Sequence, residues 1–189
     1  HEKYCKKHNY KYESVIKEEG ESNNSQKISQ IKKIIDEGNE NTICVWINSN
    51  MLITNNNIKI IDFINLMEDK DVLISRDVNS INMDIMIIKN TEWTQYFVKN
   101  LKNIDSSTDL NMLITKMYEN NNQLKKKIQV ISTESQFIMN SYPETFRKES
   151  FLVNFLDMKD NNLENGINQF KDHANNNVKF TFNNVQVEC

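Results

Sequence analysis

Apolar residues follow two periods along the chain, one typical of helices and one typical of strands. Between residues 26 and 37, isoleucines recur every three or four positions, which predicts an amphipathic helix with Gly38 as its C-cap. The run Ile43–Ile47 is continuously apolar, which predicts a buried strand. The predicted helices are 1–9, 26–37, 60–67, 91–103, 108–118 and 160–174. The predicted strands are 10–15, 43–47, 51–53, 71–75, 84–89, 127–132, 151–155 and a pair within 178–187.

Strands and helices alternate in this pattern, which is typical of an α/β domain with a mostly parallel sheet. The strand at 43–47 is expected at the centre of that sheet. The chain has 189 residues, which suits one domain, and residues 160–189 are interpreted as a C-terminal extension. No Gly-rich phosphate loop occurs in the sequence, which argues against the nucleotide-binding folds that require one.

Composition narrows the function classes. The 23 basic and 26 acidic side chains give a net charge of -3, which argues against broad nucleic-acid binding. No apolar run approaches the roughly 18 residues that a membrane-spanning helix needs, so no transmembrane segment is expected. The chain contains 31 Asn, so a single Asn is weak evidence for chemistry.

Six short segments occur in the order in which one family of sugar-transferring enzymes has them. They are YCKKHNYKY from Tyr4, SQKISQIKKI from Ser25, VWINSNMLITN from Val45, SINMDIMIIKNTEWTQYFVKNL from Ser80, TESQFIMNSYPET from Thr133 and FLVNFLD from Phe151. The series resembles glycosyltransferase family 34, the galactosyl-, mannosyl- and xylosyltransferases of the GT-A fold. The resemblance implies a GT-A-type three-layer α/β sandwich, with a single domain over 1–189 that lacks the usual first N-terminal strand.

The resemblance also implies a metal site, at positions that are altered here. In the family, an Asp-x-Asp pair and a later His hold a divalent ion, typically Mn2+, that bridges the two phosphates of a nucleotide sugar. The matching residues are Asn48, Asn50 and Asn154. An amide brings a dipole instead of a charge and cannot offset the desolvation of the ion. We therefore expect no cofactor, with Mn2+ only if the altered site still binds it, and we expect the three amides to converge.

The same resemblance assigns the donor-sugar cleft. Its expected residues are Asn48, Asn50, Arg76, Asp77, Asn79, Asn82 and Asp84. Asp84 stands where the family has a Gly, which would let a backbone approach the ligand. Arg76 could face the diphosphate in place of a metal, or it could form a surface ion pair.

The acceptor side is assigned in the same way. Asp109, in the segment TDLNML, matches an acid of the family and is the catalytic candidate. The alternative for Asp109 is a solvated charge in the first turn of a helix. Asn140, Ser141 and Tyr142 match the family's Asn-Ser-Tyr segment and are expected to line the acceptor side, although Tyr142 could equally be core.

Two functions follow from these assignments. The first is transfer of a hexose or pentose from a UDP- or GDP-linked sugar to a glycan acceptor, by a domain that is metal-independent or catalytically impaired. The second is a non-catalytic relative that binds a glycan or a protein partner through the same fold. A location in the Golgi or secretory lumen would follow from the family, and a cytoplasmic one is the alternative.

Overall fold

The structure is a computed structural model. It describes residues 1–15, 23–77, 80–105, 108–131, 139–147, 149–155, 163–168, 170, 180–182 and 185–187. Contacts divide the chain into two compact units. The sheet unit comprises residues 13–47 and 60–131, and the terminal unit comprises 1–12, 48–59 and 132–189. Among the described residues, no helix is both long enough and apolar enough to cross a membrane.

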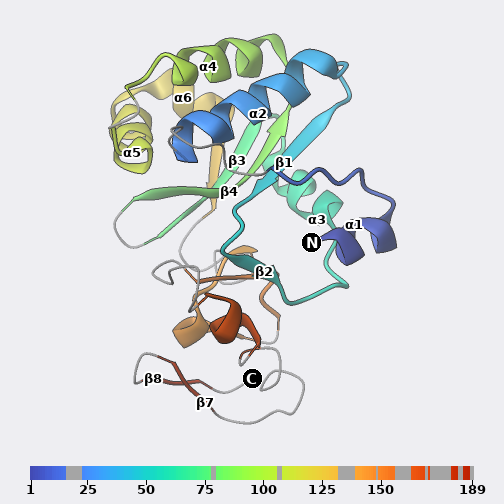
Figure 1. Ribbon diagram of the computed structural model, residues 1–189. Helices are drawn as coiled ribbons and strands as arrows, with labels where there is room; N and C mark the ends of the chain where they lie inside the picture. Colours follow the sequence, from blue (N-terminus) through green and yellow to red (C-terminus); the bar gives the residue numbers. More distant parts are fainter. Residues whose placement is uncertain are drawn as a thin grey trace. The chain divides into compact units, whose positions relative to one another are not determined.

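The sheet unit is built on four strands in the order β1-β4-β3-β5 (Figure 1). They are β1 Ile43–Ile47, β3 Val72–Arg76, β4 Ile81–Lys89 and β5 Ile128–Ile131. β4 runs antiparallel to both β1 and β3, and β3 pairs in parallel with β5. The predictions of a mostly parallel sheet and of a central strand at 43–47 are therefore wrong. Burial gives the reason, because β4 is buried at eight of its nine positions whereas β1, at the edge, is buried only at Cys44.

Helices cover one face of this sheet. They are α2 Asn23–Glu37, α4 Glu92–Lys102, α5 Leu110–Asn120 and α6 Asn122–Lys127, and α2 lies beside α4 (Figure 1). Ile28, Ile31 and Ile35 of α2 enter one apolar core with Phe97 and Leu101 of α4. This arrangement confirms the isoleucine stripe predicted for α2. A further short helix, α3 Ile60–Ile64, continues as a 3-10 turn, η1 Asn65–Met67, within the predicted range 60–67.

β4 carries a bulge in the part that extends beyond β1. Its register with β3 moves from Ile74 opposite Met86 to Ser75 opposite Asn82, so intervening residues of β4 lack a β3 partner. Side chains of α5 satisfy the backbone there. Thr115 Oγ1 accepts from the N–H of Ile81 at 2.8 Å, and Asn111 Oδ1 accepts from the N–H of Met83 at 3.2 Å. α5 thus fixes the conformation of the bulge.

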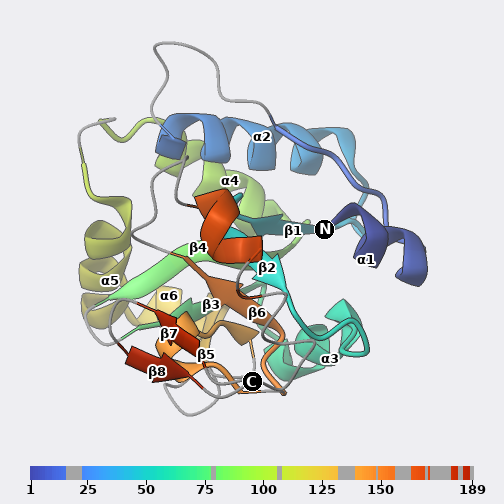
Figure 2. The same ribbon diagram turned by 60° about the horizontal axis from the view of Figure 1, so that its bottom comes forward.

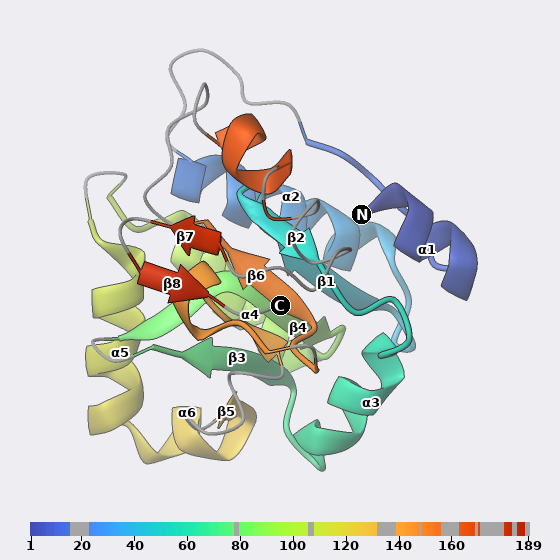
Figure 3. The same cartoon turned by 90° about the horizontal axis from the view of Figure 1, so that it is seen from below.

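The terminal unit contains a second, smaller sheet. Its elements are α1 Glu2–His8, β2 Met51–Ile53, η2 Pro143–Thr145, β6 Leu152–Asn154, β7 Phe180–Phe182 and β8 Val185–Val187. β2 pairs antiparallel with β6, and the two lie side by side in Figure 2. β7 and β8 form the predicted strand pair (Figure 3). The predicted strand at 10–15 is wrong, because these residues have no regular structure.

α1 is attached to the segment that follows β2. The Tyr4 hydroxyl donates to the carbonyl of Ile58 at 2.8 Å, and its ring meets Phe151 edge-on at a centroid distance of 5.5 Å. Nε2 of His8 donates to the carbonyl of Asn56 at 2.9 Å. Through these contacts, α1 packs against the rest of the terminal unit instead of lying in solvent.

Candidate functional site

The turn after β1 brings two of the predicted amides to β6. The N–H of Met51 donates to the carbonyl of Asn48 at 3.2 Å, which closes a four-residue turn. The carbonyl of Asn50 accepts from the N–H of Phe155 at 2.9 Å. Nδ2 of Asn50 then donates to Oδ1 of Asn154 at 3.2 Å, across 104 positions of sequence. The expected proximity of Asn50 and Asn154 is confirmed, and Asn48 is half-buried in the same turn.

Side chains on one face of β6 belong to an apolar cluster. Leu52, Val153 and Phe155 pack with Phe170 on the apolar face. Because side chains alternate along a strand, Asn154 lies on the opposite face of the sheet. We define the amide face as Asn50, Asn140 and Asn154.

Ser141 places the third amide beside β6. Its N–H donates to the carbonyl of Leu152 at 2.9 Å, and its carbonyl accepts from the N–H of Asn154 at 2.7 Å, which forms a parallel bridge to Val153. Alternation around this bridge places Asn140 on the face that carries Asn154. The Ser141 hydroxyl donates to the carbonyl of Leu152 at 2.8 Å and is buried. Tyr142, half-buried, precedes η2, where its N–H donates to Thr145 Oγ1 at 3.1 Å.

Two oxygens of the amide face have unmet hydrogen-bonding capacity. Oδ1 of Asn50 and Oδ1 of Asn140 are both buried, and within the described parts of the chain neither has a hydrogen-bond donor. Asn140 as a whole is only 4% exposed. Each unmatched buried acceptor costs about 1–3 kcal/mol relative to a satisfied one.

The amide face does not fit the Mn2+ that the resemblance implies. Its candidate ligands are neutral amides, and Asn154 is fully buried with its oxygen engaged by Asn50. Mn2+ favours charged oxygen or imidazole ligands. Over the described ranges, no group of three or more His, Cys, Asp or Glu is placed to hold a metal ion. The residues present therefore offer the ion neither the charge nor the free ligands that it needs.

In the sheet unit, Asp84 belongs to a buried ion pair at the bulge of β4. Nζ of Lys27, from α2, donates to the carbonyl of Met83 at 3.1 Å and lies 4.0 Å from Oδ1 of Asp84. The Lys27 and Asp84 side chains are 6% and 13% exposed. Burial lowers the pKa of Lys27, and the negative charge of Asp84 partly opposes that shift. Asp84 thus has a structural partner, Lys27, which the sequence analysis did not identify.

Lys27 could have been found from the sequence. It lies four residues before Ile31, on the apolar stripe of α2, where a charged residue requires a partner. At the same bulge, Oδ1 of Asn82 accepts from the N–H of Asp84 at 2.8 Å.

The remaining donor-cleft candidates of the sheet unit are held by local contacts. The guanidinium of Arg76 donates to Oε1 of Glu119 at 2.9 Å, and both side chains are partly exposed. Arg76 therefore forms the surface ion pair that was the alternative prediction for this residue. Oδ1 of Asp77 accepts from the N–H of Ser80 at 2.8 Å and stabilises the turn before β4. Asn79 lies outside the described residues.

Asp109 is the N-cap of α5. Its Oδ1 accepts from the N–H of Met112 at 3.1 Å, so this helix begins after Asp109 and not at the predicted residue 108. An N-cap carboxylate satisfies one of the open N–H groups of the first turn and interacts favourably with the helix dipole.

We expect Asp109→Ala to lower the free energy of unfolding by about 1 kcal/mol, because the cap is lost. Asp109→Asn should leave it nearly unchanged, because Asn caps about as well as Asp. Urea denaturation of both variants, followed by circular dichroism, measures the difference. Equal losses in the two variants would contradict the capping role.

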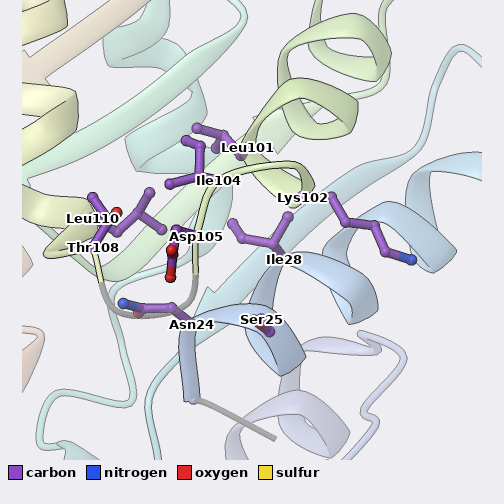
Figure 4. A pocket seen from close by; sticks show the side chains of 9 residues that line it. All are labelled: Asn24, Ser25, Ile28, Leu101, Lys102, Ile104, Asp105, Thr108 and Leu110. Carbon is purple, nitrogen blue, oxygen red and sulfur yellow. The ribbon is translucent and has the colours of Figure 1, made fainter.

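A small hollow lies elsewhere, between α2 and the α4–α5 connection (Figure 4). Ile28, Leu101 and Leu110 line it, and its volume is ≈ 20 Å³, which is room for about one water molecule. Lys102 extends away from it. The hollow contains none of the predicted site residues and is too small for a nucleotide sugar.

Comparisons with known proteins identify the fold. No protein-family model matches the chain, and no curated protein matches it. Among solved structures, the crystal structure of a glycosyltransferase involved in the glycosylation of the major capsid of PBCV-1 superposes with a TM-score of 0.66. The two chains are 16% identical, over 89% of this chain and 88% of that one. The chain therefore shares the mixed α/β fold of that glycosyltransferase.

Proposed function

We propose that this domain is a GT-A-type relative of glycosyltransferase family 34 that binds a UDP- or GDP-linked sugar without a divalent ion. The fold likeness to a glycosyltransferase and the ordered motif series support the family. The hydrogen bond of 3.2 Å between Asn50 and Asn154 carries the metal-free part of the proposal. It joins two of the three positions where the family has metal ligands, and it occupies the oxygen of Asn154.

A metal-free site still has to balance the charge of a diphosphate. Arg76 is the candidate, because a guanidinium binds phosphate oxygens through two parallel N–H groups. Its side chain is 35% exposed, so it can exchange Glu119 for a ligand at small cost. In this proposal Asp77, Asn79 and Asn82 line the donor cleft.

The acceptor side of the proposal uses Asp109 as the catalytic carboxylate, with Asn140, Ser141 and Tyr142 on the acceptor wall. A glycan hydroxyl is the group that would receive the sugar. In this proposal Asp109 acts in sugar transfer from its position at the start of α5, where its Oδ1 also accepts the hydrogen bond from the N–H of Met112.

Calorimetric titration with UDP-galactose, UDP-xylose and GDP-mannose, in EDTA and again in Mn2+, tests the proposal. We expect one donor to bind equally well in both buffers. Arg76→Gln should weaken that binding about tenfold, through loss of a charge-assisted contact. The matched control is Glu119→Gln, which frees Arg76 and should leave binding unchanged or tighter. Binding that requires Mn2+, or no binding of any donor, would contradict the proposal.

The second candidate is a non-catalytic module that binds a glycan or a protein. The neutral amide pair favours it, because Asn50 and Asn154 supply neither the carboxylate nor the imidazole that would hold an ion to assist departure of the diphosphate. Donor binding without release of UDP or GDP in the presence of glycan acceptors would select this reading over transfer.

A further inference from the structure

Arg76 is held from two directions by one helix, α5. Its guanidinium pairs with Glu119 of α5 at 2.9 Å. On the adjacent strand β4, the residue opposite Arg76 is Ile81, whose N–H donates to Oγ1 of Thr115, also in α5, at 2.8 Å. Because Thr115 and Glu119 are four positions apart, they lie on the same face of the helix. α5 therefore contacts both the side chain of Arg76 and the strand that pairs with its backbone.

The end of the β3–β4 hairpin depends on this contact with α5. Beyond the pair of Arg76 and Ile81, the N–H of Asp77 donates to the carbonyl of Ser80 at 2.9 Å, and the N–H of Ser80 donates to Oδ1 of Asp77 at 2.8 Å. These two bonds shape the turn itself. On the other side of the pair, the bulge of β4 interrupts the ladder that joins the hairpin end to the rest of the sheet. α5 lies beside this end of the sheet (Figure 3).

Thr115 has the hydrogen-bonding groups that this role requires. Its hydroxyl donates to the carbonyl of Asn111, one turn earlier in α5, at 2.7 Å, which leaves the oxygen to accept from the N–H of Ile81. Thr115 and Ile81 are both buried, so water does not replace this bond. Serine keeps the donor and the acceptor, whereas valine has nearly the shape of threonine and has neither. These two substitutions separate the hydrogen bond from packing.

We propose that Thr115 is a positioning residue that fixes Arg76 at the donor cleft through the backbone of Ile81. The inference rests on the proposed function in that a diphosphate is the group Arg76 would bind, but the placing of Arg76 can be measured without any ligand. Thr115 does not touch the ligand, and its effect passes through Arg76. α5 then serves both halves of the proposed site, because its N-cap is Asp109, the candidate catalytic carboxylate.

The Nε–H signal of Arg76 tests the placing directly. The chain contains two arginines, Arg76 and Arg147, so Arg76→Gln assigns the signal in a proton–nitrogen correlation spectrum. We expect Thr115→Val to move this signal towards that of an exposed arginine, and Thr115→Ser to leave it near its native position. An unchanged signal in Thr115→Val would overturn the inference, whether or not any donor binds.

Hydrogen exchange of the native chain provides a measurement without a variant. The N–H of Ile81 should exchange with deuterium as slowly as the buried amides of β4, because Thr115 accepts from it. Exchange as fast as that of an exposed amide would show that the bond to Thr115 is not formed, and would overturn the inference even if Thr115→Val fails to fold.

Thr94 provides the matched control in the same unit. It is a buried threonine of α4, and its Oγ1 likewise accepts from a backbone N–H, that of Thr91, at 2.9 Å. Thr94→Val should lower the urea midpoint about as much as Thr115→Val does, and it should leave the Arg76 signal unchanged. A shift of that signal as large as the one in Thr115→Val would overturn the inference, because any loss of stability would then suffice.

Donor affinity separates the inference from the proposed function. Thr115→Val should weaken binding of the nucleotide sugar about threefold to tenfold, and Thr94→Val should leave it unchanged. The double variant Thr115→Val/Arg76→Gln should bind no more weakly than Arg76→Gln alone, because Thr115 acts through Arg76. Additive losses would overturn the inference and leave the proposed function intact. The expected shift of the Arg76 signal, in a chain that binds no donor, would contradict the proposed function alone.

Discussion

Lys27→Met is expected to lower the free energy of unfolding by about 3 kcal/mol, the cost of leaving a buried charge without its partner. The partner is Asp84, whose carboxylate lies 4.0 Å from Nζ of Lys27 inside the bulge of β4. The same change removes the hydrogen bond to the carbonyl of Met83. Chemical denaturation monitored by fluorescence measures the effect.

The double variant Lys27→Met/Asp84→Asn should recover most of that loss, because no charge remains buried. Lys32→Met is the matched control on the same helix. Lys32 pairs with Asp36 at an exposed i,i+4 position, and its loss should cost no more than about 0.5 kcal/mol. Additive effects of the two single changes, at Lys27 and at Asp84, would show that the pair is not coupled.

The pH dependence of stability gives a second readout of Lys27. Its pKa in the folded protein is below the ordinary value of 10.5, so the unfolded chain binds the extra proton more tightly. Between the folded pKa and 10.5, stability should therefore rise with pH. This contribution should be absent in Lys27→Met.

The triple change Asn48→Asp, Asn50→Asp and Asn154→His is expected to create a Mn2+ site where the native sequence has three amides. It supplies two carboxylates and an imidazole in place of three amides. The turn from Asn48 to Met51, and the register of Met51 opposite Asn154, hold the three positions close together. We expect no measurable Mn2+ binding by the native sequence and measurable binding by the variant, strengthened by UDP or GDP.

Two matched variants control for the triple change. Asn55→Asp and Asn57→Asp add carboxylates to the exposed segment after β2 and should bind no Mn2+. A triple variant that folds but does not bind Mn2+ would show that these three positions do not form a metal site. Transfer activity need not return with the metal, because Asp84 still occupies the position where the family has Gly.

The sequence predicted strand positions better than strand directions. The bounds of β1 and β2 match the predictions, because each is a short apolar run between polar residues. An apolar run carries no information on direction, so the antiparallel pairing of β4 was missed. β4 itself begins at Ile81 and not at the predicted residue 84, because the polar side chain of Asn82 interrupts the apolar pattern although it is buried within the strand.

Local capping chemistry explains two further differences. The sequence pattern predicts a helix that ends at residue 118 and a strand that begins at 127, with no regular element between them. Oδ1 of Asn121 instead accepts from the N–H groups of Gln123 and Leu124 and starts α6. Because the chain contains 31 Asn, a single Asn is weak evidence for a helix cap.

The site was predictable only in part. Motif order brought Asn50 and Asn154 together, which hydrophobic periodicity alone could not have done. The ion pair of Lys27 and Asp84 was missed because its two members come from α2 and β4, 57 positions apart in the numbering, and no local pattern joins them. The unmatched oxygens of the amide face depend on three-dimensional burial, which the sequence does not encode in any short motif.

Mn2+ titration of the native protein in the presence of saturating UDP, followed by electron paramagnetic resonance of the free ion, tests the central claim most directly. The account predicts that the signal of free Mn2+ equals that of a solution containing UDP alone at every protein concentration, because the paired amides of Asn50 and Asn154 offer no charged ligand. A loss of free Mn2+ that grows with protein concentration, and that disappears in Asn50→Leu, would contradict it.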